Sequence, residues 1–172
     1  MKRILFVLII SAASLPVAEA QDLTQPYIWI GLEFGPGYHP EYDDAVAGKV
    51  EYQMQIDRHL ITINYLSVGE VLSSHYAASV MYGRVISPLD WKVMAAVSTG
   101  ASYVSDRHAP IGLFGGSSGS SSRYEAIGLP VQLNLQFRMY RYFAFATTVS
   151  GNINRNKSFG GVTFGIHIGK FW

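Results

Sequence analysis

The chain of 172 residues contains no cysteine, which excludes disulfide bonds, lipoprotein anchoring, thiolate nucleophiles and cysteine-ligated metals. Charge is scarce as well. Charged residues make up 15% of the chain and the net charge is +1, so electrostatics give no reason to expect a nucleic-acid partner. Beyond Ala20 there is no apolar run of about 18 residues, so no transmembrane helix is expected. The chain is therefore either soluble or crosses a membrane as a closed barrel, because only helices and closed barrels satisfy the backbone in lipid.

The first 20 residues have the features of a secretory signal peptide. Met1-Lys2-Arg3 is a short basic start, the stretch from Ile4 to Ala13 is apolar, and Ala18-Glu19-Ala20 is a small-x-small cleavage site. The apolar stretch is too short to span a bilayer as a helix. We therefore expect a signal peptide at 1–20, removed on export, and a single domain at 21–172.

The remaining chain divides into eight segments in which apolar and polar or small residues alternate with a period of two. The clearest is the sixth, where Ile127, Leu129, Val131 and further apolar residues share one face and amides share the other. This period is typical of β-strands, and most segments have the ten or so residues of a tilted transmembrane strand. The expected strands are 27–38, 45–57, 59–68, 74–86, 91–105, 124–138, 142–154 and 159–172. Pro130 lies within the sixth and predicts a bulge or local kink there.

One face of these strands is large and apolar, whereas the other mixes charge, amide and glycine. A barrel of eight strands has room inside only for side chains, so the small and polar set is expected in the lumen and the large set against lipid. A soluble lipocalin-like barrel would show the opposite arrangement. The predicted fold is all-β: an eight-stranded antiparallel up-and-down transmembrane β-barrel.

The lengths of the connections support this prediction. The turns after the second, fourth and sixth strands are expected to be tight, and the loops after the odd strands are generally longer, as in outer-membrane barrels. The longest connection spans about 106–123 and ends in a glycine- and serine-rich stretch. Aromatic residues cluster near the strand ends, as interfacial girdles require; they include Trp29 and Phe171.

Two segments resemble a known family. The stretch from Tyr124 to Leu133 is similar to the Leu/Ile-Pro-apolar strand of small outer-membrane β-barrel domain proteins, particularly those of Bacteroidetes-type bacteria. The last strand, with Phe164, Ile166, Ile168 and Trp172, is similar to the signal read by the barrel-assembly machinery, although Lys170 departs from the aromatic often found there. The resemblance implies fold and location in the outer membrane of a Gram-negative bacterium. It implies no catalytic residue.

Several charged and amide side chains fall on the inward face by alternation. Because buried charge is costly unless paired, we expect a salt-bridged, amide-rich plug and no open channel. The predicted interior network comprises Glu33, Lys49, Glu51, Lys92, Gln132, Asn134, Arg138 and His167.

No constellation in the chain is a convincing catalytic or metal site. A deacylase-like His-x-Ser-Asn pattern is missing at His167, and Ser73-Ser74-His75 with Glu70 is better explained as a hydrogen-bonded loop cluster. His39, Glu41, Asp43 and Asp44 share the first loop and offer oxygen and imidazole ligands, but their spacing matches no defined metal site. The preferred interpretation is a solvated acidic loop near cation-bridged lipopolysaccharide. We expect no catalytic residue, metal or cofactor.

The expected function is therefore a structural or surface-interaction role for a monomeric outer-membrane barrel. The candidate recognition surface is the third loop, because loops on a rigid scaffold commonly carry function. Its candidate residues are Asp106, Arg107, His108 and Arg123. The expected partners are outer-membrane lipid, lipopolysaccharide and, during biogenesis, the barrel-assembly machinery. Two alternatives stay open: a lipid A-modifying enzyme and, less favoured, a soluble periplasmic carrier.

Overall fold

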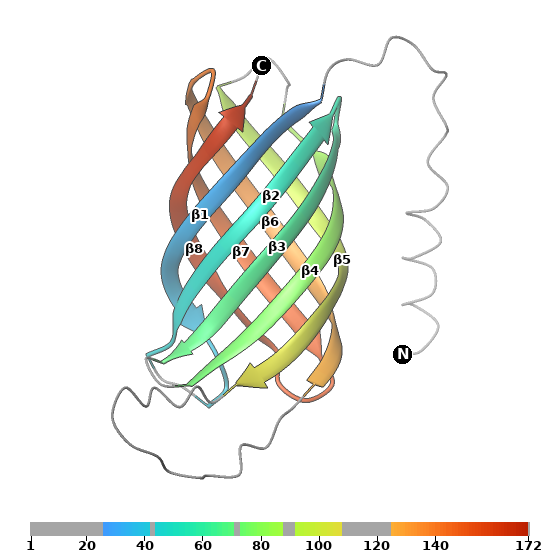
Figure 1. The fold of residues 1–172 in the computed structure, drawn as a ribbon, viewed down its shortest axis with the longest axis vertical. Helices are drawn as coiled ribbons and strands as arrows, with labels where there is room; N and C mark the ends of the chain where they lie inside the picture. Colours follow the sequence, from blue (N-terminus) through green and yellow to red (C-terminus); the bar gives the residue numbers. More distant parts are fainter. Residues whose placement is uncertain (1–25, 42–43, 71–72, 88–91, 108–124, 172) are drawn as a thin grey trace.

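The structure is a computed structural model that describes residues 26–41, 44–70, 73–87, 92–107 and 125–171. Each strand is hydrogen-bonded to its sequence neighbours, and β1 pairs with β8, so the sheet closes into a barrel (Figure 1). Within these ranges no helix is long and apolar enough to cross a membrane. The strands are β1 (Tyr27–Tyr38), β2 (Val46–Ile56), β3 (His59–Glu70), β4 (Ser73–Val85), β5 (Val93–Arg107), β6 (Glu125–Tyr140), β7 (Phe143–Asn154) and β8 (Phe159–Lys170).

All eight strand pairs are antiparallel, which gives the barrel two distinct ends. The connections after β2, β4 and β6 lie at the end where β1 begins and β8 finishes, here called the turn end (Figure 1). The connections after β1, β3, β5 and β7 lie at the opposite end, called the loop end. At the turn after β2, Asp57 adopts a φ of 52°, a left-handed conformation that aspartate tolerates well.

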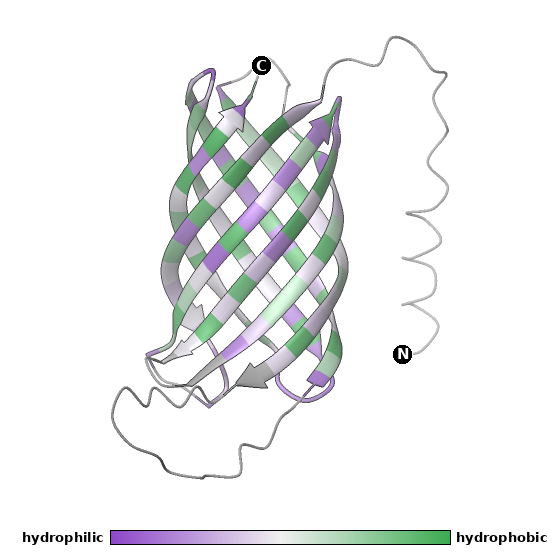
Figure 2. Ribbon diagram, in the orientation of Figure 1, coloured by the Kyte–Doolittle hydropathy of each residue, from purple (hydrophilic) through white to green (hydrophobic). Residues whose placement is uncertain are grey.

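The side chains alternate between the outside and the lumen along every strand. Figure 2 shows this as alternating hydrophobic and hydrophilic bands on the ribbons. In β6, for example, Leu133 and Leu135 point outward and are exposed, whereas Gln132, Asn134 and Gln136 are buried. Through the middle of the barrel the large apolar residues thus point outward, which is the arrangement that lipid requires and the reverse of a lipocalin-like carrier.

The expected fold class is confirmed, and every predicted strand end lies within two residues of the observed one. The expected difference between loops and turns is only partly correct. The connection after β3 consists of residues 71–72 alone, whereas the connection after β4 runs over residues 86–92. The longest connection, which joins β5 to β6 over residues 108–124, does lie at the loop end as expected.

Pro130 makes no bulge with β7. It pairs with Asn152 in an uninterrupted register, and the register shift between β6 and β7 lies between Arg138 and Tyr140. Towards β5 the ladder is interrupted at Leu129 and Pro130 and resumes in the same register. The predicted bulge is therefore not found, whereas a local irregularity does lie at Pro130. There the Thr99 hydroxyl donates to the Pro130 carbonyl oxygen at 2.9 Å, so a side chain supplies a donor beside the residue that lacks one.

The lumen is layered along the barrel axis. Its middle is polar, and each end holds a cluster of buried apolar side chains. The cluster near the turn end, the turn-side layer, contains Trp29, Leu60, Val85, Met94, Ala96, Ala144 and Phe171. The cluster near the loop end, the loop-side layer, contains Ala45, Ala47, Leu66, Val68, Ala77, Val104 and Phe159.

The turn-side layer corrects the expectation for two aromatic residues. Trp29 and Phe171 were assigned to an interfacial girdle, but both are buried in the lumen, with their ring centroids 5.3 Å apart. Trp29 lies in the same inward register as Glu33, so alternation outweighed its position near a strand end. Tyr38, Tyr140 and Tyr142 do point outward near strand ends.

Candidate functional site

The centre of the lumen holds four charged or titratable side chains, here called the charged network: Glu33, Lys49, Glu51 and His167. The ammonium of Lys49 lies between the two carboxylates, 3.1 Å from Glu33 Oε1 and 3.0 Å from Glu51 Oε2. On the other side, Nε2 of His167 lies 2.8 Å from Glu33 Oε1 and 3.1 Å from Glu51 Oε1. Every one of these side chains is fully buried. Each carboxylate therefore contacts both basic groups, which offsets the cost of burying it.

Neighbouring strands complete the bonding of the Glu33 carboxylate. The Thr148 hydroxyl on β7 donates to its Oε1 at 3.0 Å, and the Thr163 hydroxyl on β8 donates to its Oε2 at 2.6 Å. Asn134 in turn donates to Thr148 at 2.9 Å. The register explains this convergence, since Glu33 pairs directly with Lys49 on β2 and lies beside β8 on its other edge.

Strands β2 and β6, which face each other across the eight-stranded barrel, are joined directly through the lumen by three hydrogen bonds. Near the middle, Gln132 Nε2 donates to Glu51 Oε2 at 2.9 Å. The next bond towards the turn end runs from Gln136 Nε2 to Gln53 Oε1, at 3.4 Å. Because the two strands lie on opposite walls, these side chains bridge the lumen at those levels.

The third bond lies closest to the turn end. There Arg138 Nη2 donates to Gln55 Oε1 at 3.0 Å and also contacts the sulfur of Met94 in the turn-side layer. The guanidinium thus joins the polar middle to the apolar end of the lumen. Three cross-lumen bonds and two apolar layers thus occupy successive levels of the described lumen.

Seven of the eight predicted interior residues are buried in the lumen; Lys92 is not. The prediction for Lys92 is wrong because β5 begins at Val93, so this side chain precedes the strand and is exposed. Alternation orients a side chain only within a strand. The buried ones are Glu33, Lys49, Glu51, Gln132, Asn134, Arg138 and His167.

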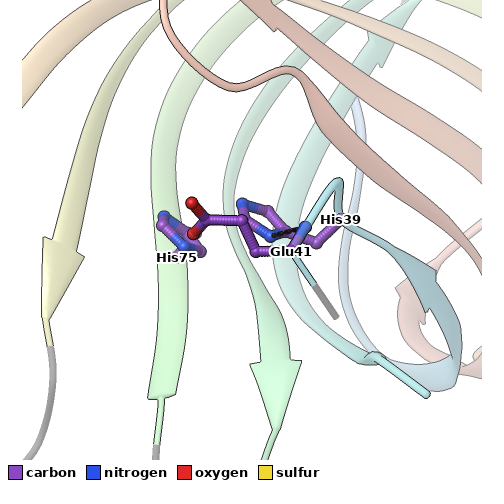
Figure 3. Close-up of side chains that lie close together, drawn as sticks. All are labelled: His39, Glu41 and His75. Carbon is purple, nitrogen blue, oxygen red and sulfur yellow. Dashed lines mark hydrogen bonds between the residues drawn. The ribbon is translucent and has the colours of Figure 1, made fainter. Parts of the chain in front are cut away.

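A second cluster lies at the loop end, where the sequence had placed two separate loops. The imidazoles of His39 and His75 stack with centroids 3.9 Å apart and planes 13° from parallel, and both rings are buried. Figure 3 shows the Glu41 carboxylate lying close to them. The Glu41 amide donates to His39 Nδ1 at 3.2 Å. Phe159 of the loop-side layer lies against both histidine rings.

Glu41 also forms an exposed ion pair with Lys157, which follows β7, at 2.7 Å. The hydrogen bond from Lys157 lowers the pKa of Glu41 below its ordinary value, and the charges of Lys157, His39 and His75 act in the same direction. The carboxylate is therefore ionised at neutral pH, beside two imidazoles.

The other predicted site residues lie partly outside the described part of the chain. Asp43, His108, Arg123 and Trp172 belong to the ranges that are not described, and Asp106 and Arg107 end β5. Asp44 is exposed and does not join His39 and Glu41 in a common group of potential ligands. Phe164, Ile166 and Ile168 point outward from β8.

Neither histidine considered for catalysis lies on the outer surface of the barrel. His75 is stacked on His39 and His167 is bound within the charged network, and both are buried. A lipid A-modifying enzyme of the deacylase type needs its His-Ser pair on the outside, where the acyl chains are. The arrangement of these two residues therefore gives that alternative no support.

No protein-family model and no curated protein sequence matches the chain. Its similarity is to solved structures. The N-terminal β-barrel domain of Pseudomonas aeruginosa OprF matches with a TM-score of 0.59 and 14% identity, covering 84% of this chain and 99% of that one. Neisserial surface protein A (NspA) matches with a TM-score of 0.64 and 10% identity, covering 86% and 99%.

A third similar structure is Ail, the attachment invasion locus protein of Yersinia pestis, with a TM-score of 0.56 and 16% identity, covering 83% of this chain and 96% of that one. All three are small eight-stranded outer-membrane β-barrels. At sequence identities of 10–16% the similarity shows a shared fold alone. The chain thus has the closed, eight-stranded antiparallel fold of the small outer-membrane β-barrels.

Proposed function

We propose that this chain is an integral outer-membrane barrel without an open pore, whose role is structural or interactive and is exerted at its loop end. The observation that carries the proposal is the set of buried side chains that bond β2 to β6 across the lumen. A barrel that offers no passage has two surfaces left for function. These are the outer face, which contacts lipid, and the loop end, which lies opposite the end where β1 begins and β8 finishes.

The outward face supports membrane insertion along the whole barrel. Residues such as Ile30, Val80, Leu133 and Phe164 come from different strands and are all exposed, so an apolar band surrounds the barrel. The cost of such a band in water is large, whereas in lipid it is favourable. The band and the likeness to outer-membrane barrels together favour contact with outer-membrane lipid and lipopolysaccharide.

The proposed biogenesis is based on the first 20 residues and on the last strand. A signal peptide ending at Ala20 directs export and is cleaved, and the barrel-assembly machinery then recognises Phe164, Ile166, Ile168 and Trp172 of the last strand. The assembled barrel is a monomer. The Bacteroidetes-type affiliation is supported by the Leu129-Pro130-Val131 pattern.

The third loop, from Asp106 to Arg123, is the proposed recognition surface. Two observations support this proposal. The loop connects β5 and β6 at the loop end of a closed scaffold, and a protein of the same fold, Ail, is named an attachment invasion locus protein. Deletion of Gly115–Ser122 should leave the barrel folded and abolish binding to cells or matrix. Unchanged binding would contradict the role of this loop.

Closure of the lumen is tested by single-channel recording in planar bilayers. The purified barrel should give no large, stable conductance. A large conductance whose ion selectivity shifts in Glu33→Gln or Lys49→Met would contradict the proposal, because those charges would then line a water-filled path.

A further inference from the structure

Three side chains that can bind a metal converge at the loop end, although they come from separate parts of the sequence. His39 follows β1, Glu41 lies two residues later, and His75 belongs to β4. One ring nitrogen of each histidine and one carboxylate oxygen of Glu41 all lie within 4.8 Å of one another (Figure 3). This separation allows one ion to contact all three once the stacked histidine rings turn so that a nitrogen of each ring points at the ion.

The types of ligand atom narrow the class of metal. Two imidazoles and one carboxylate form the ligand set of divalent transition metals such as zinc, nickel and iron, whereas calcium and magnesium prefer oxygen ligands. Three protein ligands leave further coordination positions for water or an external group. The Glu41 carboxylate supplies an oxygen ligand beside the two imidazoles.

The surroundings of the cluster also suit a metal site. Both histidines are buried, and Phe159 packs against both rings, which restricts their motion on one side. Glu41 is exposed, with 49% of its side chain accessible, so the cluster borders solvent on the carboxylate side. A rigid apolar support below the ligands and an opening on one side are features of sites that bind an ion and keep it accessible.

We propose that His39, Glu41 and His75 bind one divalent transition-metal ion of the zinc class at the loop end of the barrel. This site is independent of the proposed role of the barrel, since a closed outer-membrane barrel needs no metal.

The charged network provides an internal contrast. Glu33, Glu51 and His167 also lie close enough together to be potential ligands. The ammonium of Lys49, however, lies 3.1 Å and 3.0 Å from the two carboxylates, so a cation already compensates their charge inside the barrel. In the loop-end cluster Lys157 pairs with the exposed Glu41 carboxylate at the edge of the barrel, where a metal ion can compete with it.

Lys157 is therefore expected to compete with the metal for Glu41. Replacing it by methionine removes both the competing ion pair and a positive charge near the site. The affinity for the metal should rise in Lys157→Met, whereas loss of any ligand should lower it. General adsorption of cations to an acidic surface would shift in the same two directions through charge alone. The changes His39→Phe and His75→Phe, which leave the Glu41 carboxylate in place, therefore separate a specific site from adsorption.

The experiment uses the full mature chain without a polyhistidine tag, refolded in detergent. Zinc binding is measured by titration calorimetry, and cobalt is used as a probe whose visible absorption reports the ligand set. The wild-type barrel should bind one zinc ion. His39→Phe, His75→Phe and Glu41→Gln should each weaken binding at least about tenfold. Phenylalanine keeps a ring in the stack, and the control is His59→Gln, an exposed histidine at the turn end that bonds Tyr82.

The folding of each variant is first checked on an unboiled gel, and only folded variants are compared. Loss of binding in the three ligand variants and its retention in His59→Gln supports the site. Absence of zinc binding by the folded wild-type barrel overturns it, as does an affinity that Glu41→Gln and His75→Phe leave unchanged. If one histidine variant fails to fold, the other histidine variant decides the question together with the visible absorption of cobalt, which reports the ligand set. Failure here would leave the closed lumen, tested by conductance, unaffected.

Discussion

Lys49 offers a sharp test of the charged network, because it is the cation that contacts both buried carboxylates. The change Lys49→Met keeps an unbranched apolar chain of similar length and removes the charge, so little void is expected. Glu33 and Glu51 then face each other with His167 as their shared basic partner. Removing one partner of a buried ion pair costs about 3–5 kcal/mol of unfolding free energy, and we expect a loss in this range.

A second substitution shows whether the loss arises from uncompensated charge. In Lys49→Met combined with Glu51→Gln, one charge of each sign is gone and Glu33 retains His167. This double variant should recover at least about 2 kcal/mol of the loss, because buried charge without a partner is the main cost. The assay is urea unfolding in detergent micelles, followed by the gel band of the folded form and by tryptophan fluorescence.

The matched control is Lys157→Met, the same substitution at an exposed ion pair, which should leave the unfolding midpoint nearly unchanged. A loss below about 1 kcal/mol in Lys49→Met would refute the reasoning, because it would mean that water reaches the carboxylates. A double variant destabilised by the sum of its single changes would refute it as well.

Three further predictions concern the closure of the barrel between β1 and β8, the outer face and the turn-side layer. A Cβ at Gly165 would collide with the carbonyl oxygen of Leu32 where β8 meets β1, so Gly165→Ala should lose the compact form on an unboiled gel. The control is Gly151→Ala, which should keep this form because its Cβ would meet no atom closer than 4.0 Å. Leu133→Arg places a charge on the lipid face and should lower unfolding free energy in vesicles by about 2–4 kcal/mol; an unchanged value would mean that this face is wet. Phe171→Ala removes a buried ring and should cost about 3–5 kcal/mol in urea unfolding, and a cost near zero would place the ring outside the lumen.

Alternation in the sequence predicted the strands and most of the lumen, because period two is imposed directly by strand geometry. Gln132 and Leu133 show this well, since their opposite environments follow from neighbouring positions in one strand. Lys92 shows the limit, because the rule fails one residue before a strand starts. Trp29 shows a second limit, because aromatic residues near strand ends are common at membrane interfaces, whereas the inward register of this residue places it in the lumen.

For the loop-end cluster, the inward direction of the two histidines could be predicted from the sequence, but not their contact. His39 continues the inward register of Glu33, and His75 shares the inward register of Met81, so both could have been assigned to the lumen from parity alone. Their stacking could not, because it depends on the stagger between β1 and β4 and on how the chain turns inward after Tyr38. The two histidines are separated in the sequence by the whole of β2 and β3, and no local pattern links them.

The central claim is that the chain forms a closed barrel with its apolar face in the outer membrane. The most direct measurement compares unboiled and boiled samples of the outer-membrane fraction on an SDS gel. The account predicts that the protein is found in this fraction and that its unboiled band migrates faster than its boiled band, because a closed, internally bonded barrel resists the detergent. A single unshifted band in the soluble fraction would contradict it, and would mean that the apolar face is covered by something other than lipid.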